Sequence, residues 1–320
     1  MISFIVIGRN EGWKLTKCFK SIFTTIKQNC LSGVEIIYID SHSTDDSLFR
    51  SKRFKTIKIF TITGKCNAAI ARNIGVKESV GDYLFFIDGD MEINPDFLPL
   101  VYNEKNGLLY NFVSGNWINY EYNDKWSKIS KSTRKNIKVD SFEFTTGGIF
   151  LIKRNLWFMA GGMKSKLNRS QDIDFGLRLA KKGFLLTRKK EIIAIHHTIP
   201  YNEKKRKWQL LLSGALFYKI VLLRDNFFNK YQWKLFLREN YTFLTLLVLC
   251  SISMITLNIY FLLIYFSVIF CRILLGKKYS FKIVVVDIFY FPICEISLFF
   301  ALFLFWPKYI IEEWEQEIVL

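Results

Sequence analysis

The chain has 320 residues, of which 51% are hydrophobic and 31 are phenylalanine, and its formal net charge is +17. This composition is too apolar for an ordinary soluble protein, so we expect part of the chain to lie in a membrane. The six cysteines are scattered without a Cys-x-x-Cys pair, which indicates neither a zinc site nor a disulfide framework and fits a reducing compartment best.

The basic charge belongs to the N-terminal three quarters of the chain. From Tyr241 to Leu320 there are five Lys/Arg and six Asp/Glu residues, so a net charge of about +18 lies on residues 1–240. A phosphate-bearing substrate or anionic lipid head groups would suit this charge. Nucleic acid is the least expected partner, because none of the usual recognition signatures is present.

The N-terminal half alternates strand-like and helix-like segments. Residues 1–7 form an apolar run without a basic leader or a small-residue cleavage site, which favours a first strand over a signal peptide and keeps this part in the cytoplasm. This alternation predicts a three-layer α/β domain with a mostly parallel sheet, whose ligand site lies at the carboxyl ends of the strands. We expect strands at 3–7, 34–39, 58–63 and 83–87, and helices at 13–28 and 68–79.

The segment Asp88-Gly89-Asp90 follows the most buried of these predicted strands. Two carboxylates separated by a glycine can hold a divalent cation through oxygen ligands, and the cation can hold a diphosphate. A polar turn that ends the strand is the alternative. The choice depends on the other motifs.

Beyond residue 103 the pattern changes. Residues 103–140 are polar, aromatic and basic, which indicates a solvated face or a membrane-facing loop. Strand character returns at 142–152, a short helix is expected at 175–182, and a strand at 192–195 ends at the pair His196-His197.

The C-terminal region carries the membrane signal. Residues 203–225 combine a basic run with apolar residues, as in a helix at a membrane surface, although a basic-ended core helix is an alternative. Residues 241–271 then run 31 positions without a charge, and 283–306 form a second apolar stretch. A single crossing by 241–271 would leave the following basic residues outside, against the positive-inside tendency, so we favour a hairpin that folds back near 256–258.

Taken in order, several segments look like the motif series of glycosyltransferase family 2. The resemblance covers about residues 1–200 and implies a GT-A fold, a nucleotide-sugar donor, an Mg²⁺ or Mn²⁺ ion, and inversion at the anomeric carbon. The segments are 5–11, 36–47, Ala71-Arg72-Asn73-x-Gly75, 81–90, Gly147-Gly148 and Gln171-Asp172.

The resemblance assigns roles residue by residue. Asp88 and Asp90 match the Asp-x-Asp pair, with Asp90 the expected direct metal contact. Asp172 matches the family's general base. The remaining matches are Asp40 for the nucleotide base or ribose, Asn10 and Glu11 for the first nucleotide-facing loop, Arg72 and Asn73 for the donor diphosphate, and Gly147 and Gly148 for the acceptor-side loop.

Two departures from the family pattern are present. The family usually has a Glu-Asp pair where this chain has Gln171-Asp172, so the first carboxylate is lost. The Gln-x-x-Arg-Trp pattern of processive synthases is absent, which favours transfer of one sugar at a time. Without the motif context, Asp172 would be interpreted as an N-terminal helix cap.

His196 and His197 resemble the strand-end histidine that completes the metal site in some family members. Adjacent residues of a strand point to opposite faces, so we expect at most one ligand and favour His196. A packing or hydrogen-bonding role for both is the alternative.

Together these features predict a membrane-anchored hexosyltransferase. We expect a catalytic domain at 1–200, an interfacial helical region at 201–240, and a transmembrane region at 241–320 with two or three helices. The protein would be multi-pass, with its catalytic domain on the cytoplasmic side and a lipid-linked or membrane-proximal glycan as acceptor. The alternatives are a processive polysaccharide synthase, a catalytically silent nucleotide-binding scaffold and, more weakly, a nucleotidyltransferase.

Overall fold

The computed structural model describes residues 1–123, 125–133, 138–200, 204–275 and 281–318. It divides into two compact units, which we call the sheet unit (Met1–Glu203 with Pro307–Leu320) and the helical unit (Lys204–Trp306). The prediction placed residues 241–320 together in a transmembrane region, but residues 307–320 belong to the sheet unit. Composition alone does not show that the chain returns to the sheet unit, because the tail follows directly on a long apolar stretch.

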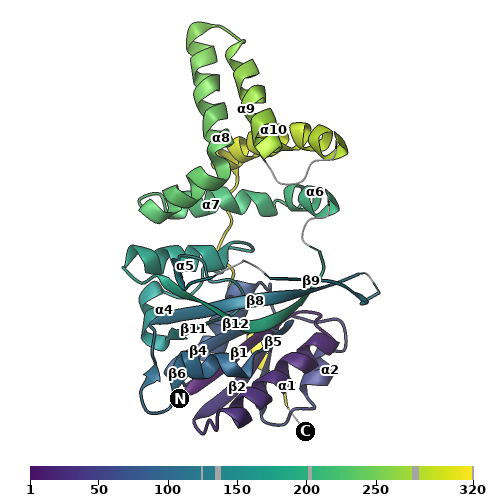
Figure 1. The fold of residues 1–320 in the computed structure, drawn as a ribbon, viewed down its shortest axis with the longest axis vertical. Coiled ribbons are helices and arrows are strands. Elements are labelled where there is room, and N and C mark those ends of the chain that lie inside the picture. Colours follow the sequence, from purple (N-terminus) through teal and green to yellow (C-terminus); the bar gives the residue numbers. More distant parts are fainter. Residues whose placement is uncertain (124, 134–137, 201–203, 276–280, 319–320) are drawn as a thin grey trace. The chain divides into compact units, whose positions relative to one another are not determined.

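The sheet unit is built on a mixed sheet, with the order β10-β12-β8-β11-β4-β1-β2-β3-β13 (Figure 1). The strands β4, β1, β2 and β3 are parallel neighbours, as predicted. The other half is largely antiparallel, so the expectation of a mostly parallel sheet is corrected to a mixed one. The strands of this sheet are β1 (Ile2–Gly8), β2 (Val34–Asp40), β3 (Ile57–Ile62), β4 (Tyr83–Asp88), β5 (Met91–Ile93), β8 (Phe112–Tyr122), β9 (Lys128–Thr133), β10 (Ser141–Glu143), β11 (Phe150–Lys153), β12 (Leu186–Thr198) and β13 (Trp314–Gln316).

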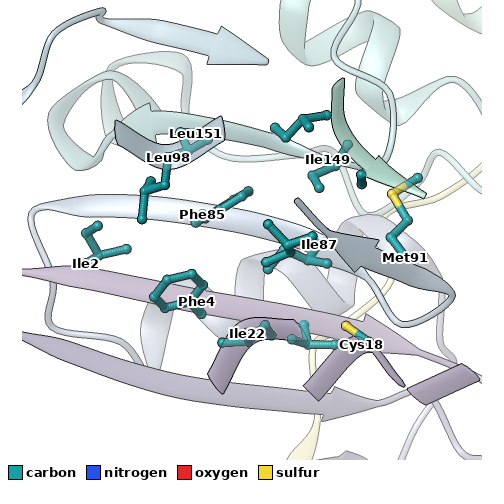
Figure 2. Close-up of a cluster of buried hydrophobic side chains, with 14 of the residues drawn as sticks. Ile2, Phe4, Cys18, Ile22, Phe85, Ile87, Met91, Leu98, Ile149 and Leu151 are labelled. Atoms are coloured by element: carbon teal, nitrogen blue, oxygen red, sulfur yellow. The ribbon is translucent and has the colours of Figure 1, made fainter. Parts of the chain in front are cut away.

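Alternate side chains of the central strands serve two cores, which confirms the three-layer arrangement. Phe4 and Phe85 face α1 and pack with Cys18 and Ile22 (Figure 2). Neighbouring residues of the same strands, such as Ile5, face the other helical layer. The helices are α1 (Trp13–Gln28) and α2 (Ser47–Ser51), then α3 (Ala68–Lys77), α4 (Arg154–Ala160) and α5 (Gln171–Lys181), with a 3-10 helix η1 (Pro95–Leu100) and a small hairpin, β6 (Tyr102–Asn103) and β7 (Gly107–Leu108).

The main error of the prediction concerns residues 103–140. They include β8, which lies inside the sheet between β12 and β11, and not only a solvated loop. Polar residues such as Asn116 and Asn119 interrupt the apolar pattern of this strand, and its pairing with β12 contains register shifts. A prediction that relies on alternating apolar and polar residues misses such a strand.

The helical unit contains the predicted fold-back. Helix α8 ends at Thr256 and α9 begins at Phe261, so residues 241–271 form a helical hairpin. Two helical stretches of the described chain, Lys230–Thr256 and Val286–Leu304, are long and apolar enough to cross a membrane by length and composition. The elements of this unit are α6 (Lys204–Leu212), η2 (Ala215–Phe217), α7 (Tyr218–Asp225), α8 (Lys230–Thr256), α9 (Phe261–Leu275) and α10 (Phe281–Leu304).

Candidate active site

The first nucleotide-facing loop is tied to the loop after β2. The Asn10 Oδ1 accepts a 2.7 Å hydrogen bond from the Thr44 amide, and Asn10 has φ 58°. Asp40 is 1% exposed and accepts hydrogen bonds from the Ser43 amide (2.7 Å), the Ser43 hydroxyl (2.6 Å) and the Tyr38 hydroxyl (2.7 Å). Asp40 therefore shapes this loop. The contact with a base or ribose that the resemblance implies stays a prediction.

Asp88 ends β4 and meets two other predicted residues. Arg72, buried on α3, donates to Asp88 Oδ1 at 2.6 Å. A Cβ at Gly148 would lie 1.9 Å from Asp88 Oδ2, so only glycine permits this close approach of the acceptor-side loop. Burial raises the pKa of Asp88 to about 6; the Arg72 charge opposes this shift and the Asp90 charge adds to it.

Asp90 is paired with a histidine from β12. Its Oδ2 lies 3.2 Å from His196 Nε2, and the other ring nitrogen lies 3.0 Å from Asn119 Oδ1. Burial lowers the pKa of His196, but the hydrogen bond and charge of Asp90 outweigh it, so the net shift is upward. Asn119 was not predicted, because its sequence position carries no signal and 77 residues separate it from His196.

Glu11 lies closer to the acidic pair than its assignment to the nucleotide loop suggested. Its carboxylate forms an ion pair with Lys14 at 2.5 Å, and its Cγ lies 3.2 Å from the position of a Cβ on Gly89. Burial and the charge of Asp90 raise the pKa of Glu11 to about 7, although Lys14 opposes the shift. The site therefore holds a third carboxyl group.

The carboxylate and imidazole groups in this region are of the types that bind a divalent cation, but they are not grouped as a complete metal site. Asp90 Oδ1 is buried and finds no hydrogen-bond partner among the described residues, so it is available as an oxygen ligand. Within the same part of the chain, no three His, Cys, Asp or Glu side chains are grouped to hold a metal ion. Asp88 is turned to Arg72 and Asp90 to His196, so a three-ligand set of Asp88, Asp90 and His196 would require rearrangement.

The two adjacent histidines have different partners, as the strand geometry predicted. His197 Nε2 contacts Glu92, and its Nδ1 lies 2.7 Å from the Tyr122 hydroxyl. The ring also packs edge-on against Trp13 of α1. His197 therefore fastens the end of β12 to α1 and β5.

The carboxylate predicted to be the base lies in the first turn of α5. Asp172 follows Gln171, whose buried Oε1 has no hydrogen-bond partner among the described residues. The residue that precedes the helix is Ser170, so Asp172 is not the N-cap. The charge of Asp172 contributes to the raised pKa of Asp88, which places the two carboxylates within electrostatic reach of each other.

The acceptor-side loop is held by a buried arginine that no sequence motif predicts. The fully buried Arg188 of β12 donates to the carbonyls of Thr145 and Thr146, both at 3.1 Å. It also donates to the Ser114 hydroxyl at 2.7 Å and pairs with Glu143 at 3.1 Å. Its contacts fix the chain immediately before Gly147 and Gly148.

The side chain of Asn73, which was predicted to lie near the donor diphosphate, has its hydrogen-bond partners in another part of the sheet unit. Its side chain exchanges hydrogen bonds with the backbone of Met163 (2.8 and 2.9 Å) and donates to Glu312 at 2.6 Å. Successive residues of a helix do not share a face, so Arg72 points to Asp88 while Asn73 points away. Asn73 therefore joins α3 to the chain before α5 and to the C-terminal tail.

Comparison with known proteins identifies the family. The model for Glycosyl transferase family 2 matches residues 3–167. The chain belongs to this family. The resemblance to glycosyltransferase family 2 is thereby confirmed.

Individual relatives are distant. Glycosyltransferase GlyG of Streptococcus pneumoniae serotype 4 is 28% identical over 128 residues, which cover 39% of this chain and 41% of GlyG, less than half of that protein. Glycosyltransferase AglE of Haloferax volcanii is 22% identical over 216 residues, covering 64% of this chain and 70% of AglE. The crystal structure of S. aureus TarS 1-349 in complex with UDP-GlcNAc has a TM-score of 0.48 at 13% identity, covering 69% of this chain and 66% of that chain.

Proposed function

We propose that this family 2 glycosyltransferase moves one hexosyl group from a nucleotide-sugar to an acceptor hydroxyl, with inversion at the anomeric carbon. The observation that carries the proposal is the convergence of functional groups at the carboxyl end of β4. Asp88 meets Arg72 and Gly148 there, Asp90 meets His196, and Asp172 lies within electrostatic reach. Sheets of this kind bind their ligands at this edge.

On the donor side, Asn10, Glu11 and Asp40 form the two loops that would receive the nucleotide. Arg72, fixed by Asp88, would face the diphosphate with its guanidinium. An Mg²⁺ or Mn²⁺ ion would be held by Asp90, with Asp88 and His196 in support, and would neutralise the charge of the departing diphosphate.

On the acceptor side, Asp172 is the proposed general base. It accepts the proton of the acceptor hydroxyl as that oxygen forms a bond to the anomeric carbon. The bond from that carbon to the diphosphate oxygen breaks, and the nucleoside diphosphate leaves. A single displacement of this kind inverts the configuration. Gly147 and Gly148 would line the path of the acceptor.

We further propose that the acceptor is a lipid-linked or membrane-proximal glycan. The charge of about +18 on residues 1–240 favours contact with anionic head groups, and the helical unit exposes many apolar side chains. The sheet unit would lie on the cytoplasmic side. The lack of a Gln-x-x-Arg-Trp segment supports transfer of one sugar over processive synthesis.

The test is release of nucleoside diphosphate from a panel of nucleotide-sugars by the full chain, with Mg²⁺ or Mn²⁺ present. Asp90→Ala should lower the rate with the accepted donor by roughly 10²–10³-fold, because a preorganised electrostatic group is lost. Asp82→Ala is the matched control, since Asp82 lies near the opposite end of β4 and is exposed. Wild-type turnover in Asp90→Ala, or no turnover with any donor, would contradict the proposal.

A further inference from the structure

The helical unit contains a hairpin whose outer surface is apolar. Figure 1 shows α8 and α9 side by side, and their seam is formed by Leu246 and Leu249 of α8 with Tyr265, Ile269 and Ile273 of α9. The outward side chains are also apolar; Val248 and Leu263, for example, are 57% and 61% exposed. A surface of this kind requires a non-aqueous partner.

The two ends of the hairpin lie next to each other. Arg272, near the end of α9, donates to the Glu239 carbonyl at 3.0 Å and lies over the Tyr241 ring. The non-helical backbone of Asn240 separates this apolar part of α8 from its charged first part. The chain therefore leaves the hairpin on the side where it entered.

The chain returns to the sheet unit after the helical unit. Residues 307–320 return to the sheet unit, and β13 pairs with β3. Residues 204–306 are thus attached to the same folded unit at both ends. Since the hairpin returns to its own base, a crossing by α10 would place β13 and β3 on opposite sides of the membrane, although they pair in one sheet.

Helix α10 exposes apolar side chains on its outward side and turns a buried carboxylate inward. Glu295 faces inward, where it accepts a 2.7 Å hydrogen bond from Tyr265 and pairs with Arg272 at 3.5 Å. One outward stripe follows helical spacing and is wholly apolar, which suits burial in the upper part of a leaflet. It consists of Phe289, Ile293, Ile296, Phe300 and Phe303.

The tip of the hairpin is apolar and internally hydrogen-bonded. Leu257 and Ile259 are 92% and 71% exposed. The Ser253 hydroxyl donates to the Asn258 carbonyl at 2.9 Å, and Asn258 Oδ1 accepts from the Tyr260 amide at 2.9 Å. A turn in water would not need an apolar surface. A turn in hydrocarbon must provide hydrogen-bond partners for its own backbone N–H and C=O groups.

The length of the hairpin agrees with a turn that lies in hydrocarbon. The apolar part of α8 and the 15 residues of α9 each extend about 22–24 Å at ~1.5 Å per residue, less than the ~30 Å of a hydrocarbon core.

We propose that residues 241–304 embed the protein in the membrane from one side, as a re-entrant hairpin with its tip in hydrocarbon and α10 in the plane of the head groups. This arrangement differs from the multi-pass topology predicted from the sequence. It rests on the membrane attachment in the proposed function. The chain enters and leaves the bilayer on the face that carries the sheet unit.

The first test locates the tip. The full chain, with its cysteines replaced and Leu257→Cys added, is spin-labelled in phosphatidylcholine–phosphatidylglycerol vesicles; a second form keeps only the exposed Cys30. The label at 257 should be relaxed by oxygen and not by a water-soluble nickel chelate, and the label at Cys30 should show the reverse. Equal access of the chelate to both labels would overturn the proposal. Donor hydrolysis by the same samples tests the proposed enzymatic function separately.

The second test concerns sidedness and charge. In sealed vesicles, a membrane-impermeant maleimide should label Glu315→Cys in β13 and Cys30 from the same side; labelling from opposite sides would overturn the proposal. Leu257→Asp should lower the membrane fraction that resists carbonate several-fold, while Val80→Asp, at a 69% exposed position of the sheet unit, should not. Full retention of Leu257→Asp would place the tip in water and contradict the re-entrant hairpin.

Discussion

Asp172 and Asp174 lie in the same helical turn, but the structure gives them different surroundings. Asp174 is fully buried and pairs with Lys164 at 3.0 Å and Arg178 at 2.8 Å. We therefore expect Asp172→Asn to reduce transfer by ~10²–10⁴-fold with an unchanged melting temperature, because the amide cannot accept a proton. Asp174→Asn should instead cost about 3–5 kcal/mol of stability, because it breaks a buried ion pair. Transfer rate, donor affinity and thermal midpoint of both variants check this. An active but less stable Asp172→Asn enzyme would refute the assignment of the base.

Glu35 gives a pH-dependent prediction far from the acidic site. Burial would raise its pKa, but hydrogen bonds from the Ser3 hydroxyl (2.7 Å), the Val80 amide (2.6 Å) and Lys58 (2.9 Å) outweigh burial and lower it. The unfolded chain takes up a proton at higher pH than the folded chain, so this stabilisation is complete above the ordinary pKa and is lost as the pH falls through the folded value.

Glu35→Gln should therefore be less stable than the wild type near pH 7 by about 1.5–3 kcal/mol, the range for hydrogen bonds to charged groups. The difference should shrink as the solution is made acidic. Thermal unfolding in detergent across this pH range measures it. A difference that does not change with pH would show that ionisation of Glu35 contributes nothing.

Local motifs account for the residues that could be predicted. The positions of Asp88 and Asp90 follow from a buried strand that ends in two carboxylates, and the structure brings them to Arg72 and His196. Asn119 and Arg188 could not be predicted in the same way, because their partners are far away in sequence and their neighbours form no motif. The hydrogen bond from Asn73 to Glu312 could not be predicted for the same reason, since 239 residues separate them.

At the scale of elements, β12 connects the two sides of the site. It carries His196 toward Asp90 and Arg188 beneath the acceptor-side loop. Arg188→Met should leave Glu143 and the loop carbonyls without their partner, at a cost of about 3–5 kcal/mol. Because the loop before Gly147 is on the acceptor side, transfer should fall more than donor hydrolysis. Thermal midpoints and the two rates measured on one preparation decide this, with Arg188→Lys as the conservative control. Equal losses in both rates would mean that the residue only stabilises the fold.

The elements were predictable where hydrophobic period and local sequence agreed. Helix α1 spans Trp13–Gln28 as expected, and the four parallel strands lie close to their predicted positions. The other half of the sheet was harder, because β8 and β12, which pair in parallel, are long and their pairing contains register shifts. Their polar residues are tolerated through buried hydrogen bonds such as that between Arg188 and Ser114, which a sequence pattern does not show.

At the scale of the whole molecule, the C-terminal tail changes how the chain can be divided. A truncation after Asn240 would seem to preserve every motif, but it would remove β13. The tail contributes Trp314, which donates to Glu78 at 2.9 Å, and Glu317, which pairs with Lys52 at 2.9 Å. The sheet unit is complete only when both of its chain segments are present.

We therefore expect an internal deletion of residues 204–306, with Glu203 and Pro307 joined by a flexible Gly/Ser linker, to give a folded protein that releases nucleoside diphosphate from the donor. A chain that stops at Glu203 should melt roughly 3–12 °C lower, since burial of one large apolar side chain contributes about 1.5–3 kcal/mol and each kcal/mol shifts the midpoint by about 2–4 °C. The linked form with Trp314→Ala and Glu317→Ala should fall between the two, because it keeps the backbone pairing of β13 with β3. Identical melting of the linked and truncated forms would show that the tail contributes no stability to the sheet.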